Sequence, residues 1–240
     1  RSRRMNAFSR LAGGRLRLAQ LQKLNPAIFL LFVLLALIVI LGPVYRTPAG
    51  IMSFLQRAAP LIILTCGQSF VLIAGGFDLS AGALITLVVI ACALIANGDP
   101  QLAWMAVAVI YAIGLGVGLL NGLIVARLKV PSIIATLGTL LSIKGAAMYW
   151  SGGAPSGYLP DNLRSVGRGV LSDIPILETL PIAVVVLVVF VGLCFWLMHA
   201  TNYGRLLLMV GDNATAAHLA GVPVNRVRVI AFVISSLSAV

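Results

Sequence analysis

Long apolar runs are the feature that most constrains this chain. A helix that crosses a lipid bilayer needs about 20 largely apolar residues, with a range of about 17 to 25. Six runs approach that length and are predicted to span a membrane: 27–44, 53–75, 80–97, 102–126, 132–150 and 177–198. The composition agrees, because 60% of the 240 residues are hydrophobic and 10% are charged, whereas soluble domains carry about 25% charged residues.

A seventh apolar run begins near Val229 and continues to Val240. Twelve residues are too few to cross a bilayer, and the sequence begins with Arg, so we expect the chain to be part of a longer protein. The sequence therefore predicts an all-α polytopic membrane protein with about six complete transmembrane helices and the start of a seventh. A basic tail, 1–26, precedes a transmembrane domain, 27–240.

The distribution of basic residues predicts the orientation, because cytoplasmic loops carry an excess of Lys and Arg. With the N-terminal tail in the cytoplasm, 12 of the 17 basic residues lie inside, in the tail and in segments 126–131 and 199–228. Four lie outside, at Arg46, Arg57, Arg164 and Arg168, and Lys144 falls within a span. The Gly/Pro/Ser-rich stretch 151–176 is then external.

Several function classes are disfavoured. The net charge of +11 is concentrated in a tail with almost no aromatic residues, which fits an anionic lipid surface better than nucleic acid. The three cysteines are far apart in apolar runs, and His199 and His218 lack acids at metal-ligand spacing. No G-x-x-x-x-G-K-[ST] phosphate loop occurs, so we expect this chain to bind no metal or cofactor and not to be an enzyme.

The stretch "AGGFDLSAG", residues 74–82, interrupts two apolar runs with glycines and an acid. One interpretation is a helix boundary, where Gly75 and Gly76 release the chain and Asp78 or Ser80 accepts the first amide hydrogens of helix 80–97. The other is a broken helix that exposes backbone and a carboxylate to a water-filled path. The two interpretations are compatible.

Glycines also recur every four residues in the run 102–126. Gly114, Gly118 and Gly122 form one smooth stripe, which favours close helix packing. Asn121 lies beside the stripe and could bond to a neighbouring helix. Lys144 could snorkel to the outer surface or pair with Asp78.

The segment "GDNATAAHLAGVPVNR", residues 211–226, lies between two apolar runs. As a helix it would gather small side chains, at Ala216, Ala217, Ala220 and Gly221, on one face. Such a helix fits a cleft on another protein, although a polar loop packed on the membrane surface has the same composition.

Four motifs carry a family resemblance: "GGFDLSAG", "NGLIVARLKVPSIIATLGT", "KGAAMYWSGG" and "GRLLLMVGDNATAAHLAGVPVNRV". In this order, over about residues 50–240, they resemble the ribose/monosaccharide permeases of bacterial ABC importers. "TAAHLAG" is similar to the loop that docks on the ATPase in such permeases. Thr215 replaces the usual Glu, and Phe77 and Ala81 replace the usual Ile and Val.

The resemblance implies a sugar-transporting permease subunit in the bacterial inner membrane, with further helices after Val240. Its implied partners are a second permease, a periplasmic sugar-binding protein and a cytoplasmic ATPase that holds ATP and Mg. The helix around 212–222 would then be the coupling helix. The residues expected to couple to the ATPase are Gly211, Asn213, Thr215, Ala216, Ala217, Ala220 and Gly221. Those expected along the translocation pathway are Gly76, Asp78, Ser80, Asn121 and Thr136.

Three alternatives stay open at this point. Related ABC permeases carry branched-chain amino acids or nucleosides. An ion-coupled secondary transporter would need intramembrane ionisable groups, and this chain offers only Asp78 and Lys144. A membrane anchor for a larger enzyme would leave the broken, glycine-striped spans without a purpose.

Overall fold

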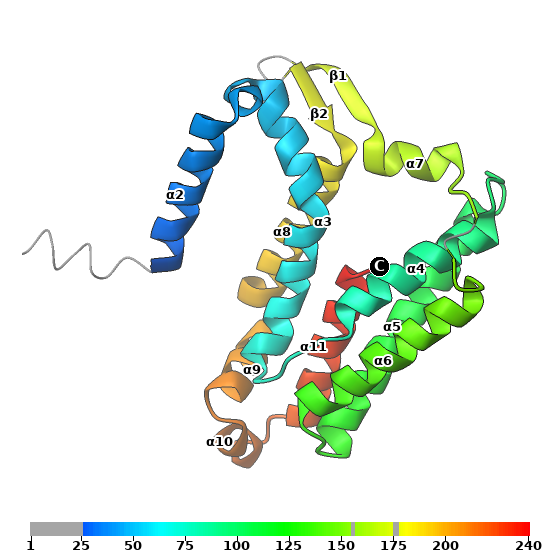
Figure 1. Ribbon diagram of the computed structural model, residues 1–240. Coiled ribbons are helices and arrows are strands. Elements are labelled where there is room, and N and C mark those ends of the chain that lie inside the picture. The colour runs from blue at the N-terminus through cyan, green and yellow to red at the C-terminus, as the bar shows by residue number, and fades with distance from the viewer. Residues whose placement is uncertain (1–25, 155–156, 175–177) are drawn as a thin grey trace, which may run out of the picture. The chain divides into compact units, whose positions relative to one another are not determined.

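The computed structural model describes residues 26–154, 157–174 and 178–240 (Figure 1). Residues 1–25 of the predicted basic tail lie outside the described residues. The chain divides into two compact units, 1–51 and 52–240, and each is described by itself. The first holds α2 (Pro26–Leu41), the 3₁₀ helix η1 (Pro43–Arg46) and the start of α3 (Pro48–Ile73). In this unit the Arg46 guanidinium donates to the carbonyls of Val39 at 3.0 Å and Ile40 at 2.6 Å, which satisfies the end of α2.

The second unit is built almost entirely of helices. Its elements are the rest of α3, followed by α4 (Ala81–Ala96), α5 (Ala103–Arg127), α6 (Ser132–Trp150), α7 (Asp161–Arg168), β1 (Val170–Ile174), β2 (Glu178–Pro181), α8 (Ile182–Ala200), α9 (Asn202–Asp212), α10 (Ala214–Leu219) and α11 (Val224–Ser238). The β1–β2 pair is antiparallel. This hairpin lies where the sequence predicted an irregular loop and the first residues of a span, so helix α8 begins later than expected.

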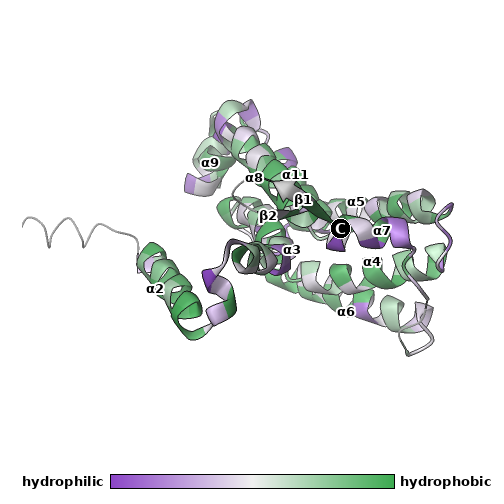
Figure 2. Cartoon of the chain, turned by 90° about the horizontal axis from the view of Figure 1, so that it is seen from above, coloured by the Kyte–Doolittle hydropathy of each residue, from purple (hydrophilic) through white to green (hydrophobic). Residues whose placement is uncertain are grey.

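Four helices in the described part of the chain are long and apolar enough to cross a membrane: α3, α5, α6 and α8. Large apolar side chains on these helices stay exposed, for example Val188, Val189 and Phe195 on α8. Figure 2 shows the apolar colouring along these helices and hydrophilic residues at α7 and near α9. Exposed apolar area of this extent fits contact with lipid. The chain is therefore a multi-pass, predominantly α-helical membrane protein.

Helix α4 agrees with the predicted span 80–97 to within one residue at each end, and the chain before it is not helical. Gly75 has φ +80°, and the amides of Gly75 and Gly76 donate to the carbonyls of Leu72 and Val71, which ends α3 in a Schellman motif. Residues 76–80 then run without helical structure to the start of α4. The 16 residues of α4 span only about 24 Å.

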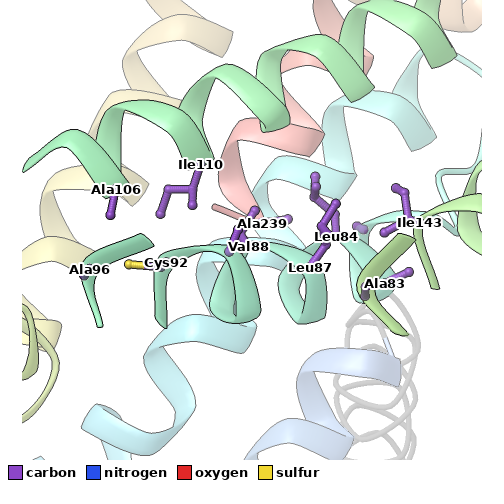
Figure 3. Packing of buried hydrophobic residues seen from close by; sticks show 13 residues of the cluster. Ala83, Leu84, Leu87, Val88, Cys92, Ala96, Ala106, Ile110, Ile143 and Ala239 are labelled. Atoms are coloured by element: carbon purple, nitrogen blue, oxygen red, sulfur yellow. The ribbon is translucent and has the colours of Figure 1, made fainter. Parts of the chain in front are cut away.

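A core of mostly small apolar side chains holds α4 against α5 and α6 (Figure 3). Ala81, Leu84 and Ala91 of α4 are almost completely buried in it. Ala106 and Ile110 come from α5, and α6 contributes Ile143 and Ala147. The alanines let the three helices approach closely, which is the main source of packing energy in lipid.

The glycine stripe of α5 lies against α11. A Cβ on Gly118 would come within 2.8 Å of the Val233 Cα, and one on Gly122 within 2.8 Å of the Val229 Cα. Backbone therefore packs on backbone, and a side chain has no room. Gly116, on the same helix, has no neighbour within 4 Å of its Cβ position.

We predict that Gly122→Ala lowers the stability of the protein by about 1–3 kcal/mol, because the added methyl forces α11 away from α5. Thermal melting in detergent, followed by size-exclusion chromatography, would measure this effect. Gly116→Ala is the matched control and should melt like the wild type. Equal melting of the two variants would contradict the packing argument.

Candidate functional site

The carboxylate of Asp78 lies inside the helix bundle, at the non-helical segment between α3 and α4. It is 6% exposed. Its Oδ1 accepts hydrogen bonds from the Ser80 amide at 3.0 Å and the Ser80 hydroxyl at 2.6 Å. Its Oδ2 accepts one from the hydroxyl of Ser235, on α11, at 2.8 Å. Both carboxylate oxygens are thus satisfied by neutral donors.

Two further side chains extend this set into α5 and α6. The Asn121 Nδ2 donates to the Ser80 Oγ at 2.9 Å, and the Thr139 hydroxyl donates to the Asn121 Oδ1 at 2.6 Å. We call Asp78, Ser80, Asn121, Thr139 and Ser235 the polar network. All five are buried, and together they connect the α3–α4 segment with α5, α6 and α11.

Other polar side chains satisfy the backbone of the same segment. The Gln68 Nε2 donates to the Asp78 carbonyl at 2.9 Å, and the Phe77 amide donates to the Ser132 Oγ at 3.0 Å. The Thr136 hydroxyl, fully buried, donates to the Ser132 carbonyl at 2.8 Å and lies 3.4 Å from the Phe77 carbonyl. Non-helical backbone at membrane depth is tolerated when protein groups satisfy it in this way.

The structure therefore brings the predicted pathway residues together. Asp78, Ser80 and Asn121 are bonded to one another, Thr136 lies beside them, and the Cβ position of Gly76 is 3.5 Å from the Ser132 hydroxyl. None of the four polar side chains faces a water-filled path in this conformation, because all four are buried. In the described residues Asp78 has no ion pair, so the considered pair with Lys144 does not form.

The helix-boundary interpretation holds in a modified form. Asp78 accepts the amide hydrogen of Ser80, the residue that precedes α4, but the Ser80 side chain makes no capping bond. Sequence reasoning missed Gln68, Ser132, Thr139 and Ser235. Each is a polar residue in or beside an apolar run, which is the signal that identified Asn121.

A second candidate site lies in the loop 199–228, where the helix predicted around 212–222 is the shorter helix α10, which directly follows α9. Helix α9 continues to Asp212, and the Asn213 side chain then caps α10 by accepting from the amides of Thr215 and Ala216 at 3.0 Å. At its other end Gly221 has φ +84°, and the amides of Gly221 and Val222 donate to the carbonyls of His218 and Ala217, a second Schellman motif.

The predicted coupling residues divide between two sides of α10. Ala217 is 5% exposed and belongs to the buried cluster that also contains Val210, Val222 and Phe232, so its side chain is not available to a partner in this structure. This corrects the assignment of Ala217 to an outward docking face. Thr215, Ala216, Ala220 and Gly221 are exposed. Leu219, which sequence reasoning did not select, is 84% exposed.

Helix α9 connects this loop with α3 and α11. A Cβ on Gly211 would lie 2.3 Å from the Ile73 carbonyl oxygen, so α9 rests directly on the end of α3. Tyr203 stacks on Phe70 of α3 with 6.3 Å between ring centroids, and its hydroxyl donates to the Val227 carbonyl of α11 at 3.3 Å. Burial raises the pKa of the Tyr203 phenol, so this hydroxyl stays a donor at neutral pH.

Among the described residues, no three His, Cys, Asp or Glu side chains are grouped so as to hold a metal ion. The polar network consists of hydrogen-bonded hydroxyls, an amide and a carboxylate. The arrangement can hold the α3–α4 segment, α5, α6 and α11 together through hydrogen bonds that can be exchanged for others.

Comparison with known proteins gives the family context. Residues 50–240 match the family described as branched-chain amino acid transport system / permease component. The autoinducer 2 import system permease protein LsrC of Enterobacter sp. (strain 638) is 34% identical over 216 residues, which are 89% of this chain and 60% of that protein. The ribose import permease protein RbsC of Bacillus subtilis (strain 168) is 32% identical over 222 residues, 90% of this chain and 66% of that protein.

The ribose import permease protein RbsC of Escherichia coli (strain K12) is 29% identical over 219 residues, 87% of this chain and 64% of that protein. The chain thus spans about three fifths of the length of the curated relatives it matches. No solved structure matches it.

We predict that Ser235→Ala destabilises the protein by about 1.5–3 kcal/mol, because it removes a hydrogen bond to a buried carboxylate. Ser236→Ala is the matched control: Ser236 is equally buried on the same helix, and its hydroxyl has no hydrogen-bond partner among the described residues. Melting temperatures of both variants in detergent would test this. A Ser235→Ala variant that melts at the same temperature as Ser236→Ala would contradict the predicted contribution of the Ser235 hydroxyl.

Proposed function

Because this chain belongs to the branched-chain amino acid transport system / permease component family, we propose that it is the membrane-spanning subunit of an ABC importer for a monosaccharide or sugar-like solute. The observation that carries the proposal is the match over residues 50–240, which contains both candidate sites. The curated relatives import ribose and autoinducer 2 by name, and this supports a sugar-like solute over an amino acid.

The proposed partners follow from this subunit role. A separate cytoplasmic ABC ATPase would hold ATP and Mg and hydrolyse the nucleotide, and this chain would have no ATPase site of its own. A periplasmic sugar-binding protein would deliver the solute. A second permease, identical or related, would complete the pathway in the inner membrane of a bacterium.

The geometry supports α10 as the element that contacts the ATPase. It is a short helix, capped at both ends, and Ala216, Leu219 and Ala220 are exposed on it. An exposed leucine beside two alanines offers an apolar contact that a partner's cleft would desolvate. Asn213 and Gly221 then serve to fix the two ends of α10.

A movement of α10 would be transmitted to the polar network through two sets of packed residues. Ala217 and Val222 pack in the same cluster as Val227 and Phe232 of α11. Gly211 and Tyr203 of α9 contact α3. Because α11 also carries Ser235, a shift of α11 relative to α4 would break its bond with Asp78. Opening of the polar network would then expose Asp78, Ser80, Asn121 and Thr136 to the translocation pathway.

A branched-chain amino acid permease is the second candidate, favoured by the description of the matching family. An ion-coupled transporter is less well supported, since the Asp78 carboxylate is hydrogen-bonded to hydroxyls and a backbone amide.

Uptake into proteoliposomes that contain the full complex would distinguish the sugar importer, the amino acid permease and the ion-coupled transporter. Labelled ribose should enter with ATP and a binding protein, and unlabelled monosaccharide should compete where leucine does not. Uptake that needs only an ion gradient would overturn the proposal.

We predict that Leu219→Arg weakens association with the ATPase about 30-fold or more, as removal of a buried apolar anchor costs 2 kcal/mol or more. Pull-down of the full-length protein from native membranes in mild detergent would measure this, with insertion unchanged. Leu128→Arg is the matched control, because Leu128 is also exposed and lies outside α10.

Ala217→Arg should behave differently from Leu219→Arg. It places a charged side chain in the apolar cluster of α9, α10 and α11, so it should reduce the yield of folded protein. Full association of Leu219→Arg with the ATPase would remove the assignment of α10 as the coupling helix.

A further inference from the structure

A cleft of about 950 Å³ lies where α5 ends and α11 begins, with α10 along one side. Arg127, Lys129 and Arg226 line it, and so do the apolar side chains of Leu123, Val229 and Ile230. Its size falls within the range of about 300–1,000 Å³ that is usual for small-molecule sites. The lining is thus cationic on one part and aliphatic on another.

A second hollow of about 390 Å³ adjoins the first through Lys129 and Asn225, which line both. It adds Arg228 and the hydroxyl-bearing Ser132. Lys129 follows the end of α5 with φ +56°, a left-handed conformation that non-glycine residues seldom adopt. This sharp turn places the lysine at the boundary between the two hollows.

Among the described residues, the cations of these hollows form no ion pair with a carboxylate. No acidic residue lines either hollow. Within the described residues the ion pair that forms joins Arg164 and Asp161, on α7. Arg127, Lys129, Arg226 and Arg228 therefore create a positive field that is not neutralised by the described chain, and an anion is the complementary ligand.

The position of the cleft indicates where that anion comes from. Helix α5 is a candidate membrane span that ends at Arg127, so the cleft lies at the level where a bilayer's headgroups begin. Leu123 is one turn earlier on α5, toward the membrane interior by the orientation predicted from the sequence. A ligand with a phosphate and an acyl-bearing glycerol matches both parts of the lining, and basic pockets between spans bind such headgroups.

We propose that this cleft binds the phosphate-containing headgroup of an anionic phospholipid. Arg127 and Arg226 contact the phosphate, since guanidinium groups bind phosphate oxygens in pairs. Lys129 adds a point charge, and the aliphatic residues contact the glycerol end of the lipid. Leu219 is not part of the lining, so its exposed side chain stays free for a protein partner while the lipid occupies the other side of α10.

The test is native mass spectrometry of the purified full-length protein titrated with phosphatidylglycerol, with phosphatidylcholine as the neutral comparison. Phosphatidylglycerol should bind more tightly. Each removed cation should weaken its binding about fivefold, the equivalent of ~1 kcal/mol. The double variant Arg127→Gln/Arg226→Gln should therefore lose about 25-fold. Arg205→Gln, on α9 and outside both hollows, is the matched control and should bind like the wild type.

Lys129→Gly keeps the test valid if the double variant does not fold. Glycine adopts the left-handed conformation without strain, so this variant removes the charge and favours the native turn. It should bind phosphatidylglycerol about fivefold more weakly. Binding that is unchanged in these variants, or lost equally in Arg205→Gln, would overturn the proposal.

Two other outcomes would also overturn the lipid assignment. Displacement of phosphatidylglycerol by millimolar inorganic phosphate would assign the cleft to a free anion. Unchanged lipid binding with weakened ATPase association in the double variant would assign it to an acidic protein surface.

Discussion

A backbone that leaves the helical state inside a bilayer must find its hydrogen-bond partners within the protein, and the segment between α3 and α4 imposes this requirement here. Gln68, Ser132 and Thr136 satisfy its backbone, and the polar network satisfies the Asp78 carboxylate. Because those partners come from α3, α5, α6 and α11, the requirement of one short segment fixes the mutual position of four helices.

Helix α11 connects the two candidate sites because its different faces carry different contacts. Val229 and Val233 pack on the glycines of α5, which allows close approach, while Ser235 reaches Asp78. In its first turn, the Val227 carbonyl accepts a hydrogen bond from the Tyr203 hydroxyl. A helix packed mainly by backbone contact can shift along its neighbour with little repacking of large side chains. In the proposed transporter, this freedom to shift would be a physical reason for the glycine stripe.

The sequence contained enough to predict the helical membrane class and the residues at the centre of the first site. Asp78 and Asn121 stand out because polar groups are costly among apolar ones. Ser235 could not be predicted, since serine is common in spans and its bond to Asp78 joins positions far apart in the chain. The hairpin β1–β2 was also missed. The non-helical conformation of residues 76–80 depends on hydrogen bonds made by other helices, which no local pattern records.

One small residue of α10, Ala217, has a different cause from the one the sequence suggested. A six-residue helix is too short to be stable alone, so its form depends on its caps and on burial of one side. Ala217 provides that burial, in the same apolar cluster as Val210, Val222 and Phe232. The alanine is therefore explained by packing within this chain. A partner would recognise what remains outside, Leu219 and its exposed neighbours, and the rigid inner side would transmit the force of that contact to α11.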